Sequence, residues 1–314
     1  MLKKIELING HTLESVSGLG DYCLRDTLEC GQCFRFEPVG AGAILPDEYV
    51  VTMRDRVVRV GQRERGELVF IDCEGAADDP AVRSYFALDT SLADIKADVI
   101  AHTDSEWLRE AAECGGGIAL LKQDPWEALV SFIISQNNNI PRIKKIIKQI
   151  AIEYGANLTL QNVSKPTCPL AICEGEPDES VCKRCGICYA FPSPFDILSR
   201  PEGLLPSRPG FRYAYILDAA EKVASGEVDL DDIASVGSYT YTLEQLKRIK
   251  GVGDKVASCA ALFGFANLEA FPIDVWMKRA IDTYFNGDLD PASLGKYAGF
   301  AQQYIFHYIR NMHS

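Results

Sequence analysis

The chain has 314 residues, enough for about two domains of ordinary size. Hydrophobic residues make up 47% of it and charged residues 24%, a balance that excludes disordered, collagen-like and coiled-coil chains. The net charge of −12 argues against a protein that coats nucleic acid by bulk attraction. A local basic face remains compatible with that total, because phosphate binding depends on where the cations lie.

The sequence predicts an intracellular protein with no membrane partner. No apolar run reaches the roughly 18–20 residues that a membrane span needs. The segment Met1–Gly10 alternates charged and apolar residues, and it lacks the apolar stretch of a secretory signal.

The first part of the chain, residues 1–115, predicts a β-rich domain that packs with the helices of the rest. Tyr49–Thr52, Arg56–Val60 and Leu68–Ile71 are short runs with β-branched and aromatic residues. Turn-prone residues separate them, as an antiparallel arrangement of consecutive strands requires.

From Pro80 onward the hydrophobic period changes to that of helices. Residues 116–314 therefore predict a mostly helical domain. The segments with helical spacing are Leu92–Ile100, Pro125–Ser135, Ile143–Ala151, Tyr213–Val223, Leu243–Ile249, Val256–Phe263 and Tyr297–Ile309.

Local signals mark the ends of two of these helices. Asp124 before Pro125 is typical of an N-cap followed by proline at the first helical position. Thr242 with Gln245 three residues later predicts a capping box. The segment 164–194 interrupts the helical pattern with five prolines and five cysteines, and it is predicted to be an insertion.

Residues 243–264 predict two helices joined by the tight turn Gly251-Val252-Gly253, which is the pattern of a helix–hairpin–helix. The glycines allow backbone N–H groups to approach a phosphate, and the start of the second helix favours the anion. Gly251 and Gly253 are therefore candidate DNA-backbone contacts.

Lys255 and Asp274 carry the predicted chemistry. Lys255 lies in the first turn of the second hairpin helix, where a desolvated lysine holds a larger share of the free amine. A free amine can attack a sugar C1′ and form a Schiff base. Asp274 follows nineteen residues later, just before another helix, where its carboxylate can cap that helix and face developing positive charge.

The segment 246–279 resembles the helix–hairpin–helix glycosylase superfamily through Lys-Gly-Val-Gly-Asp-Lys-Val-Ala-Ser-Cys and Phe-Pro-Ile-Asp-Val. More narrowly, the chain resembles the 8-oxoguanine DNA glycosylase/AP lyase family over nearly all its length except the insertion. The resemblance implies an α+β fold, with an N-terminal antiparallel, TBP-like domain followed by the helical glycosylase domain. It also implies excision of 8-oxoguanine opposite cytosine through a Schiff base on Lys255, with Asp274 stabilising the cationic sugar.

Four residues resemble the family's base-recognition set. Gly31, in Gly-Gln-Cys-Phe-Arg, matches the glycine whose carbonyl accepts the N7–H of the oxidised base. Gln302 matches the glutamine on the Watson–Crick edge, and Phe306 matches the aromatic residue that stacks on the base. Cys259 matches the residue on the opposite face of the base.

Four further residues resemble the family's DNA contacts. Asn137 matches the asparagine that fills the gap left by the flipped base, and Phe211 takes the place of a wedge tyrosine. Arg142 and Arg212 match the two arginines that read the orphaned cytosine. Trp276 departs from the pattern of some members, so contacts to the DNA backbone near it are expected to differ.

The insertion has spacings typical of a metal site. Two C-x2-C steps occur in it, and four thiolates of the five would close a tetrahedral zinc site. An iron–sulfur centre and a loop of free thiols are the alternatives, and no cysteine follows Cys259 to form the superfamily's C-terminal cluster. The candidate ligands are Cys168, Cys173, Cys182, Cys185 and Cys188.

Other functions stay open at this point. A non-catalytic helix–hairpin–helix DNA-binding module would have no need of Lys255 with Asp274. A glycosylase for alkylated bases usually lacks the lysine, and an adenine- or pyrimidine-excising relative fits Gln302 and Phe306 less well. The expected partner is double-stranded DNA containing oxidised guanine; catalysis needs no cofactor, and the resemblance implies a monomer.

Overall fold

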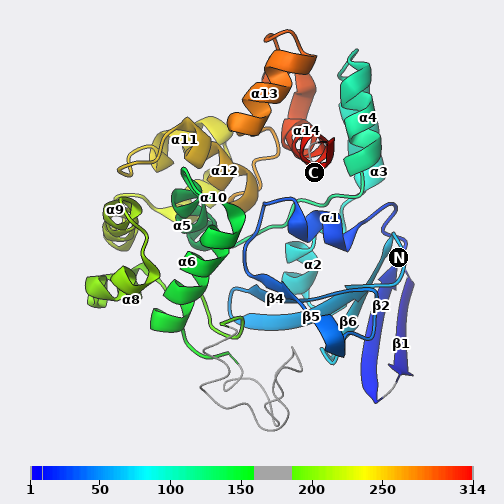
Figure 1. Ribbon diagram of the computed structural model, residues 1–314, viewed down its shortest axis with the longest axis horizontal. Coiled ribbons are helices and arrows are strands. Elements are labelled where there is room, and N and C mark those ends of the chain that lie inside the picture. The colour runs from blue at the N-terminus through cyan, green and yellow to red at the C-terminus, as the bar shows by residue number, and fades with distance from the viewer. Residues whose placement is uncertain (1, 9, 159–185, 313–314) are drawn as a thin grey trace.

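Six antiparallel strands form one sheet in the N-terminal part of the chain (Figure 1). The computed structural model describes residues 2–8, 10–158 and 186–312. The predicted antiparallel unit is confirmed, and the three predicted runs are β4, β5 and β6. In sheet order the strands are β1 (Leu2–Ile8), β2 (His11–Ser17), β6 (Glu67–Ile71), β5 (Arg56–Gln62), β4 (Asp47–Met53) and β3 (Phe36–Pro38).

The central strands are buried on both faces. Leu68–Ile71 is fully buried, because its side chains alternate between two different hydrophobic clusters. Leu68 and Phe70 belong to the main core, whereas Val69 and Ile71 pack with Leu13 under the loop before β4. Burial on both faces explains why this strand is a continuous apolar run instead of an alternating one.

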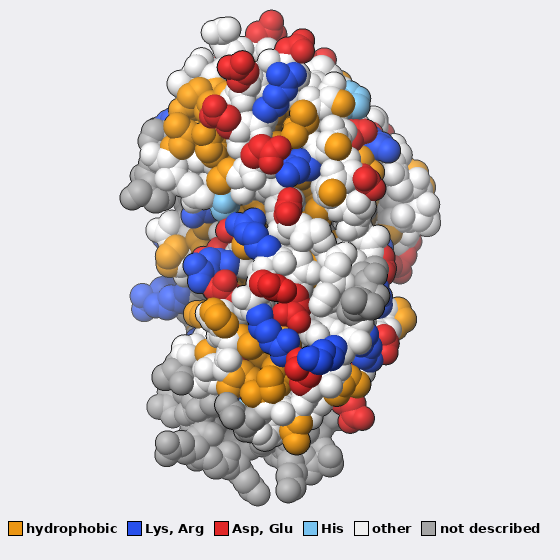
Figure 2. Space-filling view, turned by 90° about the vertical axis from the view of Figure 1, so that its right-hand side faces the viewer, with side chains coloured by type: hydrophobic (Ala, Val, Ile, Leu, Met, Phe, Trp, Pro, Cys, Tyr) orange, Lys and Arg blue, Asp and Glu red, His pale blue; other side chains and the backbone are white. Residues whose placement is uncertain are grey.

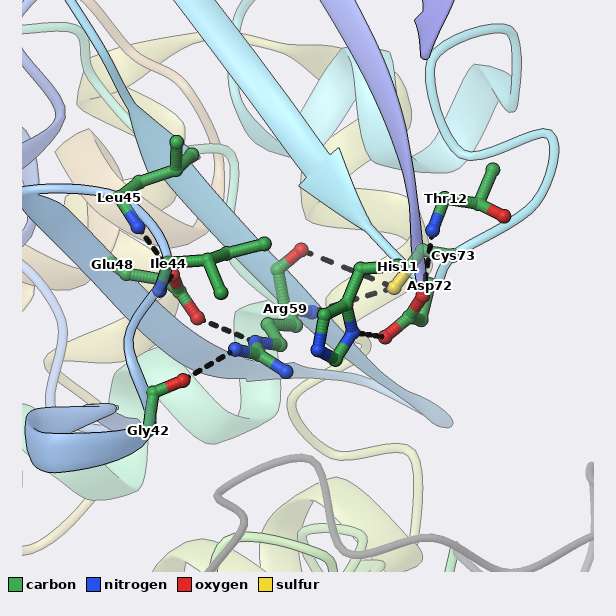
Figure 3. A network of polar contacts seen from close by, with 9 residues as sticks. All are labelled: His11, Thr12, Gly42, Ile44, Leu45, Glu48, Arg59, Asp72 and Cys73. Carbon is green, nitrogen blue, oxygen red and sulfur yellow. Dashed lines mark hydrogen bonds and ion pairs between the residues drawn. The ribbon is translucent and has the colours of Figure 1, made fainter. Parts of the chain in front are cut away.

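A buried ion pair connects the sheet to that loop (Figure 3). Arg59 on β5 donates to the carboxylate of Glu48 on β4, and its Nη2 donates to the Gly42 carbonyl at 3.0 Å. The other oxygen of Glu48 accepts the backbone N–H groups of Ile44 at 2.7 Å and Leu45 at 3.0 Å. Both charged groups therefore have partners, as buried charges require.

Helices make up most of the remaining chain. The predicted helices are confirmed as α3, α5, α6, α9, α12 and α14, and the first hairpin helix is α11. Five helices were not predicted, namely α1, α2, α4, α8 and α10. The helices are α1 (Leu24–Glu29), α2 (Pro80–Tyr85), α3 (Leu92–Ala101), α4 (Glu106–Gly115), α5 (Pro125–Ser135), α6 (Ile140–Tyr154), α8 (Pro194–Ser199), α9 (Arg212–Ala224), α10 (Leu230–Val236), α11 (Tyr239–Leu246), α12 (Asp254–Gly264), α13 (Val275–Tyr284) and α14 (Ala298–Met312), with 3-10 helices η1 (Gly40–Gly42), η2 (Pro201–Ser207) and η3 (Pro291–Tyr297).

One hydrophobic core runs from the sheet into the helices. Figure 1 shows α5, α6 and α8–α12 on one side of the molecule, the sheet on the other, and α13 and α14 beside α4. Two helix pairs pack closely because one partner has a glycine at the contact. Between α4 and α14, a Cβ on Gly115 would lie 3.2 Å from the Cα of Tyr304. Between α12 and α5, a Cβ on Gly264 would lie 3.1 Å from the Cβ of Ala128. The fold is thus α+β, and the domain boundary at residue 115 stays a prediction.

The two predicted helix starts have different outcomes. Asp124 caps α5 as predicted, because its side chain accepts the N–H of Glu127 at 3.0 Å. The capping box at Thr242 is wrong: α11 begins one turn earlier, with Ser238 as its N-cap. The Thr242 hydroxyl lies inside the helix and donates to the Ser238 carbonyl at 2.9 Å, so it cannot cap.

In the part of the chain that the structure describes, no helix combines the length and the apolar character that crossing a bilayer demands.

Candidate active site

The hairpin turn brings a helix start into contact with α9. Gly251 has a φ of +79°, a conformation that L side chains rarely adopt, and a Cβ on it would lie 2.3 Å from the Tyr215 ring. Only glycine fits there. Gly253 is the N-cap of α12, is exposed and has open space where a Cβ would point, so it contributes no side chain that could cover this helix start.

Lys255 leaves the first turn of α12 toward α5. Its side chain is half-buried, and its Nζ donates to the Oγ of Ser135 at 3.1 Å. The ammonium lies 5.4 Å from the centre of the Phe132 ring. The amine therefore does not point into bulk solvent; it is held against the end of α5.

Asp274 is the N-cap of α13, as predicted. Its Oδ1 accepts the N–H of Met277 at 2.9 Å, and the carboxylate is half-buried. Lys255 and Asp274 line the same cavity, and these two described residues form no ion pair with each other. One oxygen of the carboxylate thus caps the helix, and the residue also lines the cavity.

The structure brings six predicted residues together around one cavity of about 60 Å³. The cavity lies between α5, α12 and α14, and it holds no more than a few water molecules. Four of the residues were predicted for base recognition and two for catalysis. They are Gly31, Cys259, Gln302, Phe306, Lys255 and Asp274.

Close packing surrounds the predicted base site. Gly31 has a φ of +91°, and a Cβ there would lie 3.6 Å from the Cε1 of Phe306. Cys259 is 4% exposed, and burial raises the pKa of its thiol, with the nearby Lys255 opposing that rise. The thiol is therefore a neutral, apolar surface at neutral pH.

The residues predicted to fill the gap in the DNA and to read the orphaned cytosine lie on or beside two adjoining loops. Asn137 is exposed and has a φ of +47°, a conformation that asparagine tolerates better than most residues. Phe211 is 54% exposed, and the Arg212 guanidinium lies 4.4 Å from the centre of its ring. Arg142 is exposed in the first turn of α6, behind the Asn139 N-cap.

Arg212 differs from its neighbours because its guanidinium is buried. It is 3% exposed and donates to the backbone carbonyls of Gln136 and Asn137, the latter at 3.0 Å. Burial and the nearby Arg142 lower the pKa of Arg212. In this structure Arg212 therefore supports the Asn137 loop and does not present its donors to solvent.

Three exposed cations on α6 and α13 have no acidic partner in the described part of the chain. Arg142, Lys278 and Arg279 are exposed, and none of them pairs with a carboxylate in residues 2–158 or 186–312 as described. On the face that carries β1 and α4, by contrast, Figure 2 shows acidic and basic side chains interspersed with hydrophobic ones. A local basic face is thus compatible with the acidic total charge.

Four of the five predicted metal ligands, Cys168, Cys173, Cys182 and Cys185, lie outside the described residues. Cys188 is described, and its side chain is fully buried with Val39, Val50 and Ile187. Within the described ranges, no group of three or more metal-binding side chains occurs. The zinc site stays a prediction.

Two residues at the site escaped the sequence analysis. Ser135 holds Lys255, and Gln303 lines the cavity beside Gln302. Ser135 ends a helix that was predicted with the correct bounds, but nothing in the local sequence links it to Lys255. Gln303 could have been noticed as a second amide next to Gln302 in the largely apolar first half of this helix.

Comparison with known proteins agrees with this geometry. A family model described as the 8-oxoguanine DNA glycosylase N-terminal domain matches residues 17–129. A solved structure described as MBOgg1 in complex with a low-affinity DNA ligand is 33% identical, with a TM-score of 0.78, over 100% of both chains. The chain belongs to the 8-oxoguanine DNA glycosylase/lyase family.

Other known glycosylases resemble this chain over most of its length. The 8-oxoguanine glycosylase/lyase of Clostridium acetobutylicum, solved with double-stranded DNA containing cytosine opposite 8-oxoguanine, is 29% identical with a TM-score of 0.78 and 99% of each chain covered. The N-glycosylase/DNA lyase of Saccharomyces cerevisiae is 27% identical over 285 residues, which are 82% of this chain and 67% of the yeast protein. A 3-methyladenine DNA glycosylase from Archaeoglobus fulgidus shares the fold, at 18% identity and a TM-score of 0.60 over 85% of this chain and 88% of that one.

Proposed function

We propose that this chain is a base-excision repair enzyme that removes 8-oxoguanine opposite cytosine from duplex DNA and then cleaves the strand as an AP lyase. The observation that carries the proposal is the shared cavity: one amine, one carboxylate and the base-recognition set line the same small space. A non-catalytic DNA-binding hairpin has no use for such a cavity.

Recognition of the base rests on one hydrogen-bond difference. Guanine N7 is an acceptor, whereas 8-oxoguanine carries a proton there, so a carbonyl repels the first and accepts from the second. The carbonyl of Gly31 would provide that acceptor. A mispaired buried polar group costs about 1–3 kcal/mol, enough for strong discrimination.

The base must leave the duplex, and the side chains around the cavity must move apart, before the cavity can hold a purine. Unstacking costs a few kcal/mol, and Asn137 and Phe211 would offset part of that cost by filling the vacated stack. The exposure of both side chains supports this role. Arg142 would donate to the orphaned cytosine, and Arg212 would join it after releasing a backbone carbonyl of the Asn137 loop.

The hairpin would anchor the DNA backbone beside the cavity. The N–H groups at the start of α12 would bind a phosphate, since Gly251 and Gly253 keep side chains out of the way. This contact carries no sequence information and sets the register of the duplex.

The chemistry then uses side chains alone and requires no cofactor. The Nζ of Lys255 forms a bond to C1′ while the glycosidic bond breaks, and the base leaves with the bonding electron pair and takes up a proton. The Asp274 carboxylate stabilises the positive charge that develops on the sugar. The C1′–O4′ bond of the sugar then breaks as the nitrogen loses a proton to O4′, which opens the ring and forms the Schiff base. Loss of the C2′ proton from this Schiff base expels the 3′ phosphate, which is the lyase step.

The remaining expectations follow from the substrate. The enzyme acts on genomic DNA and therefore inside the cell, and its partner is a damaged duplex. Zinc bound by cysteines of the segment 164–194 would take no part in the chemistry.

The test is strand cleavage on four duplexes that hold 8-oxoguanine opposite each base. We expect cleavage that is fastest opposite cytosine and absent from an undamaged duplex. Binding without cleavage of all four duplexes would indicate a non-catalytic hairpin protein. Cleavage of a duplex with an alkylated base, but not of these four, would indicate a different glycosylase.

A further inference from the structure

Two consecutive glutamines of α14 line the base cavity. Gln302 is 4% exposed and Gln303 is 3% exposed. The Nε2 of Gln303 donates to the Oε1 of Gln302 at 2.6 Å. The two amides therefore form a connected pair at one wall of the cavity.

The Oε1 of Gln303 is buried and has no hydrogen-bond partner among the described residues. Buried polar atoms nearly always have a partner, and a buried acceptor that lacks one costs free energy. This atom belongs to a side chain that lines a ligand cavity, so an N–H group of the ligand is the natural donor to it.

The bond between the glutamines couples the orientations of their two amides. A free side-chain amide can rotate by half a turn and exchange its donor and acceptor ends. Because Gln303 donates to the oxygen of Gln302, rotation of Gln302 alone would bring two N–H groups together. In this arrangement Gln302 has one lone pair and both of its own N–H groups left for a base.

We propose that Gln303 is a second base-reading residue, whose Oε1 accepts an N–H from the 2-amino group of the flipped purine. This inference rests on the proposed function and deepens it. The Watson–Crick edge of guanine offers O6, N1–H and two N–H bonds on the 2-amino group. One amide cannot satisfy all of these, whereas Gln302 can pair with O6 and N1–H while Gln303 accepts from the amino group.

The substrate class that follows is an oxidised purine with an exocyclic 2-amino group. 8-oxohypoxanthine retains O8, the N7 proton, O6 and N1–H, and it lacks only that amino group. In its complex the Oε1 of Gln303 would stay buried without a donor. A site that hydrogen-bonds a particular substrate group discriminates against an analogue without that group.

The experiment compares single-turnover excision of 8-oxoguanine and of 8-oxohypoxanthine, each opposite cytosine, at saturating enzyme. We expect the full-length protein to excise 8-oxoguanine roughly 5- to 150-fold faster, the range that corresponds to one unsatisfied buried group. In Gln303→Met, which keeps the side-chain length and removes the acceptor, this ratio is expected to fall severalfold toward unity. A substitution that slows excision of both bases equally leaves the ratio of the two rates unchanged.

Gln149→Met is the matched control, since Gln149 is a half-buried glutamine on α6 that does not line the cavity. It should keep the wild-type ratio. If Gln303→Met fails to fold, Gln303→Leu and the wild-type ratio itself still test the proposal. Equal wild-type rates on the two bases, or a wild-type ratio in a folded Gln303 variant, would overturn it.

The two proposals fail in different ways. Excision of neither base by the wild-type protein contradicts the proposed function. Excision of 8-oxoguanine without discrimination against 8-oxohypoxanthine leaves that function in place and contradicts only the role of Gln303.

Discussion

The Nζ of Lys255 lies 3.1 Å from the Oγ of Ser135, which itself donates to the Phe132 carbonyl at 2.8 Å. Because its proton is already used, the Ser135 oxygen can only accept from the lysine. One N–H bond of the amine is thereby oriented toward α5, and the lone pair of the free amine stays available on the cavity side. Ser135 acts as a positioning residue for Lys255.

Removing that hydroxyl is expected to slow catalysis without preventing folding. Ser135→Ala should lower the single-turnover rate of 8-oxoguanine excision about tenfold, the effect of losing roughly one oriented hydrogen bond. Ser135→Thr keeps the Oγ and should recover most of the rate. Excision by Ser135→Ala at the wild-type rate would show that the contact has no catalytic role.

Lys255→Gln is expected to abolish borohydride trapping of the protein on damaged DNA, because only an amine forms a reducible Schiff base. Binding of the damaged duplex should survive, which a mobility-shift titration measures. Lys250→Gln removes an exposed lysine of the same hairpin and should leave trapping intact. Retained trapping in Lys255→Gln would assign the nucleophile to another residue.

Asp274 combines a structural and a proposed catalytic task that substitution can separate. Asparagine caps helices as well as aspartate does, so Asp274→Asn should melt close to the wild-type temperature. It removes the negative charge and should lower the excision rate by about 10²-fold. Asp274→Ala should lose the rate and also about 1 kcal/mol of stability. If Asp274→Asn excises normally, the carboxylate only caps α13.

The hairpin turn tolerates a side chain at one glycine and not at the other. Gly251→Ala combines a left-handed φ with a Cβ 2.3 Å from the Tyr215 ring, so we expect at least about 2 kcal/mol of destabilisation. For a chain of this size that lowers the melting temperature by several degrees. Gly253→Ser places a favourable N-cap in open space and should melt like the wild type. Equal melting of both variants would contradict the packing of the turn against α9.

His307 is expected to make stability depend on pH. Burial lowers its pKa below the ordinary value of 6.5, and Asp26 opposes that shift only in part. The unfolded chain therefore takes up the proton first as the pH falls, so stability is full above about pH 6.5 and declines as the pH drops through the lower, folded pKa. Thermal melts between pH 7.5 and about pH 5 should show a smaller loss in His307→Gln than in the wild type. An equal loss in both would rule out His307 as the cause.

Periodicity alone predicted most of the helices and half of the sheet. The bounds of α5 were predicted without error, because Asp124 and Pro125 mark its start and an apolar face runs to Ser135. Strands β1, β2 and β3 were missed. The exposed side chains of β1 give a weak pattern, and β3 is only three residues long. The start of α11 was misjudged because Ser238 and Thr242 are both acceptable caps, and only packing of the helix buries Thr242.

The sequence by itself determined the kinds of group at the site and their order along the chain: an amine at a helix start, a carboxylate at the next N-cap, and an amide and a ring on the last long helix. Such features are local, because they depend on neighbours within a turn or two. Tertiary structure decided which groups touch. Ser135 meets Lys255 across 120 positions, and Arg212 turns inward to carbonyls 75 and 76 positions away. The oxygen of Gln303 is enclosed with no partner in the described ranges. Contacts at such separations come from the packing of α5, α9, α12 and α14, and no local pattern of residues encodes them.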